Sequence, residues 1–319
     1  MPQPGKSAVH DDKILTNYSL QYSNEMRAFV AAAGAPPVRV NKESDKYFTF
    51  AKAYWLRDPG PNTIRGPGSG YARSGYALST ATYSVDQYAL EKPIDDRTRG
   101  NTDRPLDPDR NATQFLVEQL LIRMEVMYGA AAFATSIWAT DGTVSNKWSD
   151  YTNGDPSKDV ETAKDTIRKS TGRDPNTIII GALTWRRLKF HPDLLGAFQY
   201  VERALLTQAM VAEYFEVDRF FVARAVYNSA NEGATASMGY ILNDDAFWMG
   251  YVDPNAGIES PTAMKMFNTQ GTVADNILAP EIFRYRQDEI DSDIIRASFT
   301  FDIKIVGTDL GYFIADVAD

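Results

Sequence analysis

The sequence predicts an α+β fold, and three of its segments carry that prediction. Residues 295–305 alternate apolar and polar side chains with a strict period of two, as in a strand with one buried face. Residues 108–139 place apolar side chains three and four positions apart, which predicts a long helix. From residue 155 onward, helical and strand patterns alternate. We therefore expect a long helix packed against an antiparallel sheet, followed along the chain by an α/β region.

The N-terminal residues 1–43 are expected to form an arm. Their apolar side chains are scattered, and Pro36–Pro37 forbid a continuing helix. Residues 1–57 contain 8 Lys and Arg and 5 Asp and Glu, a net charge of +3, whereas the whole chain carries −9 and the remainder therefore −12. Two interpretations stay open: an ordinary tail with accidental basic charge, or an arm that lies on an acidic neighbouring subunit.

Residues 46–57 and 75–90 are expected to be the two strands of a long β-hairpin. Between them, residues 58–75 hold five Gly and three Pro in 18 positions, which excludes regular structure at the tip. A lone two-stranded hairpin is marginally stable in water, and this one carries nine aromatic side chains. It either packs on its own domain, the usual fate of aromatic strands, or is buried on a neighbouring subunit.

The long helix is expected to begin at Asp107, which suits the N-cap, and Pro108, which suits the first helical position. Its apolar stripe continues to about residue 139. A helix of this length usually supports a sheet laid beside it, and the strand at 295–305 with the residues just before it supplies that sheet.

The α/β region is expected to open with a helix that starts at Asp155–Pro156 and stops at Gly172. Its inner face consists of Val160, Ala163 and Ile167. The elements expected after it are a buried strand at 177–181, helices at 182–190 and 203–215, and strands at 219–227, 239–243 and 246–252. The last two strands are expected to be joined by a turn at Asp244–Asp245.

The composition excludes several classes of chemistry. The chain has no cysteine and two histidines, His10 and His191, which rules out disulfides, thiol catalysis and a multi-histidine metal site within one chain. The net charge of −9 argues against general wrapping of nucleic acid. The longest uncharged stretch, residues 126–140, is shorter than the roughly 20 apolar residues of a membrane span. We expect a soluble, cytoplasmic protein without a secretion signal.

The search for catalytic motifs is negative. The glycine-rich segment 66–70 lacks the Lys and Ser or Thr of a phosphate-binding loop. Three alternating carboxylates, Glu289, Asp291 and Asp293, could hold Ca²⁺ if extended, but a solvated acidic loop is favoured because further oxygen donors and a glycine are missing. We therefore predict that the protein is not an enzyme and uses no cofactor or metal.

Three stretches, taken in their order and spacing, carry a resemblance to a known family. They are the strand and helix of TIIIGALTWRRLKFHPDL (177–194), the two Asp-linked strands of GYILNDDAFWMGYVDP (239–254), and the closing sheet of residues 282–317. The layout resembles the major capsid proteins of tailed bacteriophages, with the Hong Kong 97-type fold. That resemblance implies an N-terminal arm at 1–43, an extended loop at 44–92, a peripheral domain with a spine helix at 93–154, an axial domain at 155–268, and peripheral-domain strands at 269–319.

The resemblance also implies a structural function. Such subunits self-assemble as hexamers and pentamers into an icosahedral shell around double-stranded DNA, which they contact non-specifically. The chain is expected in the virion, after assembly in the host cytoplasm, with a portal, possibly a decoration protein, and no membrane. Some relatives begin with a cleaved scaffolding domain of about a hundred residues. This sequence has none, which implies a separate scaffolding protein or a chain supplied already mature.

Contacts between subunits are expected at the hairpin and at an acidic segment near the C-terminus. Residues 281–319 contain 9 acidic and 4 basic side chains, a net charge of −5, so the loop's Arg57, Arg65 and Arg73 could meet residues 289–293 of a neighbour. The full set of expected inter-subunit contacts is Tyr54, Trp55, Arg57, Arg65, Tyr71, Arg73, Tyr76, Glu289, Asp291 and Asp293.

Two alternatives stay open. Within the same fold, the chain could be an encapsulin, a bacterial shell that packages cargo enzymes. In a different class, it could be a hydrolase or carbohydrate-binding protein that uses Trp55, Trp185 or Trp248 as stacking platforms. A megadalton particle distinguishes the shell proteins from the carbohydrate binder.

Overall fold

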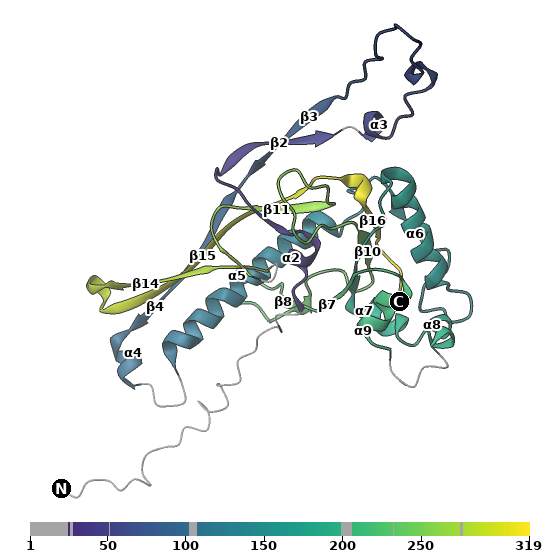
Figure 1. Cartoon of the computed structure of the whole chain (residues 1–319). Helices are drawn as coiled ribbons and strands as arrows, with labels where there is room; N and C mark the ends of the chain where they lie inside the picture. Colours follow the sequence, from purple (N-terminus) through teal and green to yellow (C-terminus); the bar gives the residue numbers. More distant parts are fainter. Residues whose placement is uncertain are drawn as a thin grey trace, which may run out of the picture.

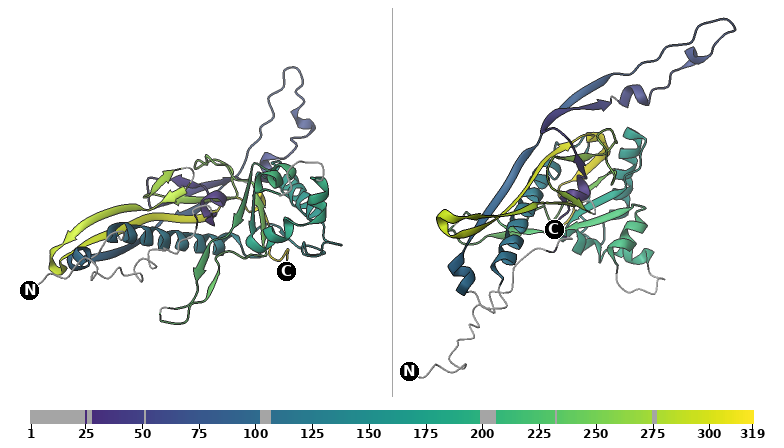
Figure 2. Two further views of the ribbon diagram at one scale, coloured as in Figure 1. Left: turned by 90° about the horizontal axis from the view of Figure 1, so that it is seen from below. Right: turned by 60° about the vertical axis from the view of Figure 1, so that its left-hand side comes forward.

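The computed structural model describes residues 25, 28–50, 52–101, 107–198, 206–231, 233–274 and 277–319. Within them, the chain builds two five-stranded sheets, and the long helix α5 (Pro108–Ala132) lies along the first (Figure 1). A long hairpin extends away from the body, and a shorter pair of strands, 226–228 with 238–240, projects on the opposite side (Figure 2). The result is an elongated molecule with two projecting ribbons.

The first sheet has the order β1–β11–β15–β14, with β4 paired to the other side of β15. The long strand β15 organises it, because β4 pairs with it antiparallel from Asp95 opposite Ser292 to Asp86 opposite Phe301. Helix α5 packs on β15 and β4, as the sequence predicts. The strands are β1 (Pro37–Arg39), β4 (Asp86–Asp95), β11 (Met264–Asn268), β14 (Glu281–Gln287) and β15 (Ser292–Ile305).

The strand predicted at 295–305 is confirmed as part of β15, but its polar face is less exposed to solvent than expected. Phe299 and Phe301 are buried among the helix-facing core. On the opposite face we expected solvent, yet Thr300 is also buried. Its hydroxyl accepts hydrogen bonds from the backbone N–H groups of Thr269 at 3.0 Å and Gln270 at 2.7 Å. The loop after β11 therefore covers this part of the strand, and the hydroxyl satisfies the covering backbone.

The second sheet has the order β5–β16–β10–β6–β7. Strands β6 and β7 are parallel, and the three short helices α7, α8 and α9 form the connection between them. Helix α6 packs against β10 and β16. The bounds are β5 (Asp141–Gly142), α6 (Pro156–Thr171), β6 (Thr177–Gly181), α7 (Ala182–Leu188), α8 (Pro192–Ala197), α9 (Gln208–Tyr214), β7 (Arg219–Ala223), β10 (Phe247–Gly250) and β16 (Gly311–Ile314).

Helix starts follow the predicted caps. The Asp107 carboxylate accepts hydrogen bonds from the backbone of Asp109 and Arg110, and the Asp155 carboxylate accepts one from Lys158. Helix α6 ends at Gly172, whose φ of 72° is the left-handed conformation that glycine adopts most readily. The first helical residue is a proline in both α5 and α6.

The predicted end of the long helix at residue 139 is wrong, since α5 stops at Ala132. Trp138 folds back, and its indole Nε1 donates a hydrogen bond to the carbonyl oxygen of Ala132 at 2.9 Å. Ser136 has a φ of 65°, which no helix tolerates. The apolar residues after 132 therefore bury themselves in the turn back rather than along the helix.

The hairpin is shorter in its strands than predicted. Strands β2 (Ser44–Phe50) and β3 (Leu78–Ser84) pair from Ser44 opposite Ser84 to Phe50 opposite Leu78. The pairing ends at Phe50, and residues 52–55 of the predicted strand 46–57 form the short helix α3 (Lys52–Trp55) instead. The second predicted strand, 75–90, divides at Val85, where pairing changes from β2 to β15. Strand β4 therefore crosses the expected boundary at residue 92.

The predicted hairpin over 239–252 is also wrong. Strand β9 (Met238–Tyr240) pairs with β8 (Val226–Asn228), whereas β10 pairs with β6 and β16. The turn at Asp244 instead caps the start of α7, because the backbone N–H groups of Leu183 and Thr184 donate hydrogen bonds to the Asp244 carbonyl oxygen. Likewise the predicted strand 219–227 is two strands, β7 and β8, in different sheets. Of the predicted helix 203–215, residues 203–205 lie outside the described residues, and α9 covers 208–214.

The remaining short elements join these parts. They are α2 (Ala31–Gly34), the 3₁₀ turn η3 (Pro61–Thr63), α4 (Asp96–Asn101), β12 (Thr272–Ala274), β13 (Ile277–Ala279), and the 3₁₀ turns η4 (Asp288–Ile290) and η5 (Thr308–Leu310).

Candidate assembly surfaces

The long hairpin is anchored at its base and exposed along its outer half. At the base, Tyr47 and Tyr83 are buried against Phe267 of β11, with ring centroids 5.4 and 4.5 Å from its own. Further out, the side chains of Trp55 and Tyr71 are 59 % and 80 % exposed. Burying large aromatic rings is favourable by several kcal/mol, on the order of 1.5 to 3 for each fully buried side chain. The hairpin therefore carries apolar surface that its own body does not cover.

The tip of the hairpin is organised by its own side chains. The Arg65 guanidinium donates to the Ser69 carbonyl oxygen at 2.8 Å and lies 4.3 Å from the Tyr71 ring centroid. Trp55 and Tyr76, from the two sides of the hairpin, are 5.3 Å apart between ring centroids. These contacts give the glycine- and proline-rich segment a shape without regular structure.

The structure places the predicted loop residues on this projecting surface. Arg57, Arg65 and Arg73 are all exposed, as are Trp55, Tyr71 and Tyr76. The side chain of Tyr54 lies outside the described part of the chain. The predicted contact residues of the loop thus all lie on the projecting hairpin. The predicted acidic residues 289–293 lie elsewhere, near the C-terminus of the chain.

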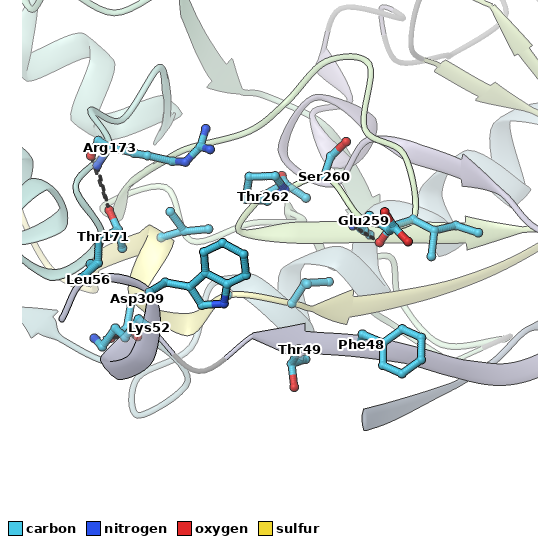
Figure 3. Close-up of a pocket in the computed structure, with 17 residues that line it drawn as sticks. Phe48, Thr49, Lys52, Leu56, Thr171, Arg173, Glu259, Ser260, Thr262 and Asp309 are labelled. Carbon is cyan, nitrogen blue, oxygen red and sulfur yellow. Dashed lines mark hydrogen bonds and ion pairs between the residues drawn. The ribbon is translucent and has the colours of Figure 1, made fainter. Parts of the chain in front are cut away.

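A groove of about 450 Å³ runs between the hairpin and the body (Figure 3). Phe48, Trp55 and Leu56 form its hairpin side, and the segment 258–262 forms part of its body side. Lys52 bridges the two, with its ammonium 2.8 Å from an Asp309 carboxylate oxygen. On its floor, burial lowers the pKa of Lys265 to about 8, and its ammonium donates to the Ile258 carbonyl oxygen at 2.7 Å. Sequence reasoning did not find this groove, because the chain brings its walls together from distant segments.

The predicted acidic segment forms the distal end of the first sheet. Asp293 is 16 % exposed, and its carboxylate lies 2.5 Å from the Arg99 guanidinium and 2.6 Å from that of Arg284. Hydrogen bonds from Arg284 and Arg99 lower the pKa of Asp293 to about 2. Its charge is thus compensated within the chain. Asp291 lies 3.8 Å from the Arg286 guanidinium but is 87 % exposed, and Glu289 is also exposed.

The three acidic residues do not form the extended arrangement considered for Ca²⁺. Residues 288–290 are a 3₁₀ turn and Asp291 has a φ of 44°, so the carboxylates do not alternate along one face. Across all the residues that the structure describes, no group of three or more His, Asp or Glu side chains is placed to hold a metal ion. Among the same described residues, no helix is both long enough and apolar enough to cross a membrane.

Comparison with known proteins settles the fold. No protein-family model matches the chain. The chain is 26 % identical over 314 residues to the major capsid protein of Burkholderia phage BcepMu, covering 96 % of each chain. It superposes on the crystal structure of a phage-related protein from Bordetella bronchiseptica RB50 with a TM-score of 0.69 at 23 % identity, covering 96 % of this chain and 97 % of that one. This chain has the Hong Kong 97-type fold.

The predicted resemblance to tailed-phage major capsid proteins is thereby confirmed. The same fold is found in the capsid structure of cyanophage P-SCSP1u, with a TM-score of 0.57 at 9 % identity over 94 % of this chain and 91 % of that one. The structure contains the long helix and the projecting hairpin that the sequence predicts, as α5 and as β2 with β3. Identity this low shows that the architecture, rather than a set of shared side chains, carries the likeness.

Two of the three tryptophans proposed as sugar platforms are not available for stacking. Trp248 and Trp185 are buried, the first between the two sheets' cores and the second against Phe220. Trp55 is exposed, and its ring lies beside that of Tyr76 within the loop at an interplanar angle of 43°.

One buried acidic residue was not predicted from the sequence. Glu125 is completely buried in α5, and its carboxylate accepts hydrogen bonds from the backbone N–H groups of Val30, at 3.0 and 3.1 Å, and Ala31, at 2.9 Å. Burial raises the pKa of Glu125 to about 7. These bonds fasten the N-terminal segment to the spine helix. A signal was present, because Glu125 lies on the same helix stripe as Leu121 and Tyr128.

Proposed function

We propose that this chain is the major capsid protein of a tailed phage, a structural subunit that self-assembles into the viral shell. Similarity to one phage major capsid protein over 96 % of both chains carries the proposal. A shell subunit needs contacts spread over several edges, and obligate interfaces bury about 2,000 to 5,000 Å² or more. The exposed aromatic side chains of the projecting hairpin support an assembly in which other copies cover them.

The finer proposal concerns the assembly's form and partners. The subunits assemble as hexamers and pentamers into an icosahedral shell that encloses double-stranded DNA, in the host cytoplasm. A separate scaffolding protein guides assembly, a portal occupies one vertex, and a decoration protein is a further candidate partner. The net charge of −9 fits a shell that contacts packaged DNA non-specifically rather than wrapping it. Residues 1–43 are the arm, 44–92 the extended loop, 93–154 and 269–319 the peripheral domain, and 155–268 the axial domain.

The proposed inter-subunit contact joins the loop of one copy to the acidic distal end of another. Arg57 and Arg73 are exposed, and Arg65 is held beside Tyr71 at the tip. Their proposed partners are Asp291 and Glu289, which are exposed, while Asp293 holds the distal end together through Arg99 and Arg284. Such pairs set the register between copies more than they add to the total affinity.

Electron microscopy of the purified chain, expressed with and without its scaffolding protein, tests the function. The proposal expects closed particles of megadalton mass in at least one of these preparations. A chain that remains a single folded molecule in both, at concentrations well above those of assembly, contradicts it.

Charge reversal tests the proposed contact. Arg65→Glu with Arg73→Glu is expected to reduce particle yield at least tenfold, because each loop then meets like charge on its neighbour. Adding Glu289→Lys and Asp291→Lys is expected to restore part of the yield. Lys169→Glu on the solvent face of α6 is the control, since that side chain is 75 % exposed and pairs within its own helix. Unchanged yield in the Arg65 and Arg73 double variant removes the contact.

A further inference from the structure

The strand β14 ends the first sheet with an open edge. Within the described strands it pairs only with β15, from Glu281 opposite Ser298 to Gln287 opposite Ser292, so the other side of its seven residues has no partner strand. It lies at the end of the molecule away from the second sheet (Figure 1). An open edge presents unpaired N–H and C=O groups in a row, which another strand can extend.

The side chains of β14 do little to protect this edge. On the outer face, Phe283 is 52 % and Tyr285 38 % exposed. Arg296 of β15 lies over the Tyr285 ring, and the Tyr285 hydroxyl donates to the Glu91 carboxylate of β4 at 3.2 Å. On the face toward α5, Arg284 is paired with Asp293 at 2.6 Å. Arg286 is likewise paired with Asp96 at 2.7 Å. The strand has no proline and no lysine, and its two arginines are neutralised within the chain. The edge is therefore suited to accept an apolar strand.

The sequence of the N-terminal arm contains a segment with a matching pattern. Residues 14–23 lie outside the described residues, and only their sequence is considered. Tyr18, Leu20 and Tyr22 alternate with polar residues at 17, 19, 21 and 23, and no charged residue occurs from 14 to 24. A period of two with aromatic and aliphatic residues on one side is typical of a strand with one buried face.

We propose that residues 14–23 of one copy of this chain add to the free edge of β14 in a second copy as an extra strand. The pairing would satisfy the open N–H and C=O groups of β14. It would also place Tyr18, Leu20 and Tyr22 beside Phe283 and Tyr285 on the outer face. The arm's root is fixed elsewhere, on the spine helix through Glu125, so the arm acts as a strap between copies. This inference rests on the proposed self-assembly and names one of its contacts.

Disulfide trapping tests the pairing. Because the chain contains no cysteine, every disulfide that forms joins introduced cysteines. Phe283→Cys protein is mixed with protein carrying one cysteine at each position from 17 to 22, assembled, and oxidised. Mixing two single-cysteine chains means that every such cross-link joins two copies. Cross-linked dimer is expected to be at least fivefold more abundant for positions 18, 20 and 22 than for 17, 19 and 21, because side chains alternate across a strand.

Ile282→Cys is the matched control, since residue 282 lies on the opposite face of the same strand. With it, the odd-numbered positions are expected to cross-link preferentially. Equal or absent cross-linking at all six positions overturns the inference. So does a double variant, Leu20→Cys with Phe283→Cys, that closes within single chains while the mixed chains do not cross-link.

Hydrogen exchange on the wild-type chain provides a second measurement that needs no variant. The backbone amides of 281–287 are expected to exchange at least tenfold more slowly in particles than in dissociated subunits. Particles whose β14 amides gain no protection overturn the strap while leaving the proposed function intact. Failure of the wild-type chain to form particles overturns the proposed function itself.

Discussion

At the scale of single residues, Glu125 links the N-terminal segment to the spine helix through a carboxylate that has no cationic partner among the described residues. Its hydrogen-bond donors are the backbone N–H groups of Val30 and Ala31. Tyr128, one turn along α5, lies close enough for the charge on Glu125 to help raise the pKa of its phenol, although burial is the larger cause. Desolvation is therefore the main influence on this carboxyl group.

The pH dependence of stability follows from that environment. The pKa of Glu125 is about 7 in the folded chain, against an ordinary value of 4.5, so the folded state holds the proton more tightly. The stabilisation is fully present below about pH 4.5 and is lost as pH rises through about 7, up to about 3 kcal/mol. Glu125→Gln is expected to remove this slope from the free energy of unfolding measured in urea between pH 5 and 8.

The exposed Glu213→Gln substitution in α9 is the control for that experiment, and it is expected to keep the wild-type slope. Parallel stability curves for wild type and Glu125→Gln contradict the assignment.

The close packing of Gly34 against Tyr128 leads to a second prediction for a single residue. A Cβ added there would overlap the hydroxyl of Tyr128, which is completely buried. Gly34→Ala is expected to destabilise the chain by about 1 to 3 kcal/mol, because the packed ring must move. Gly70→Ala in the hairpin tip meets nothing within 4 Å and is expected to change the unfolding free energy by less than about 0.5 kcal/mol. Equal effects of the two substitutions in chemical denaturation contradict the packing argument.

At the scale of elements, the start of α5 was predictable and its end was not. The start depends on Asp107 and Pro108, which act on their immediate neighbours. The end depends on Trp138, whose indole reaches back to Ala132 because the chain turns over a tertiary core. Local patterns report local hydrogen bonds, and a reversal of this kind has no local signal.

Trp138→Phe tests that reading of the helix end. Losing the indole donor leaves the Ala132 carbonyl oxygen without its partner at a buried site, and unfolding is expected to become easier by about 1 to 3 kcal/mol. Trp55→Phe, in the exposed loop, is expected to change stability by less than about 0.5 kcal/mol. If Trp138→Phe proves as neutral as Trp55→Phe in thermal or urea unfolding, the indole does not stabilise the turn.

The strand assignments show the same division. The pattern at 295–305 identified β15, because one face of it packs on α5 whatever its other partners are. The pairing of 239–252 failed, since β9 and β10 belong to different sheets and the Asp244 carbonyl instead caps α7. Of the assembly surfaces, the loop was predictable from its glycines, prolines and aromatic residues. The groove at Lys265 and the hydrogen bonds from Val30 and Ala31 to Glu125 were not predictable, because segments far apart in the sequence form them.

At the scale of the whole molecule, the account depends on surfaces that one copy leaves open. The hairpin is anchored to the body at its base through Tyr47 and Tyr83, but its outer half carries exposed aromatic side chains. Among the described strands, β14 leaves one sheet edge unpaired. Both features are unfavourable for an isolated protein and useful for one that meets many copies of itself.

Sedimentation velocity on two matched chains tests this claim most directly: the wild-type chain, and one in which residues 57–77 are replaced by a short glycine-rich turn. The account predicts megadalton particles from the wild type under assembly conditions. It predicts only small species from the shortened chain. Thermal unfolding of the free subunit is expected to be nearly unchanged, because the contacts described for Arg65, Tyr71 and Tyr76 lie within the hairpin. Particles of equal size and yield from both chains would contradict it.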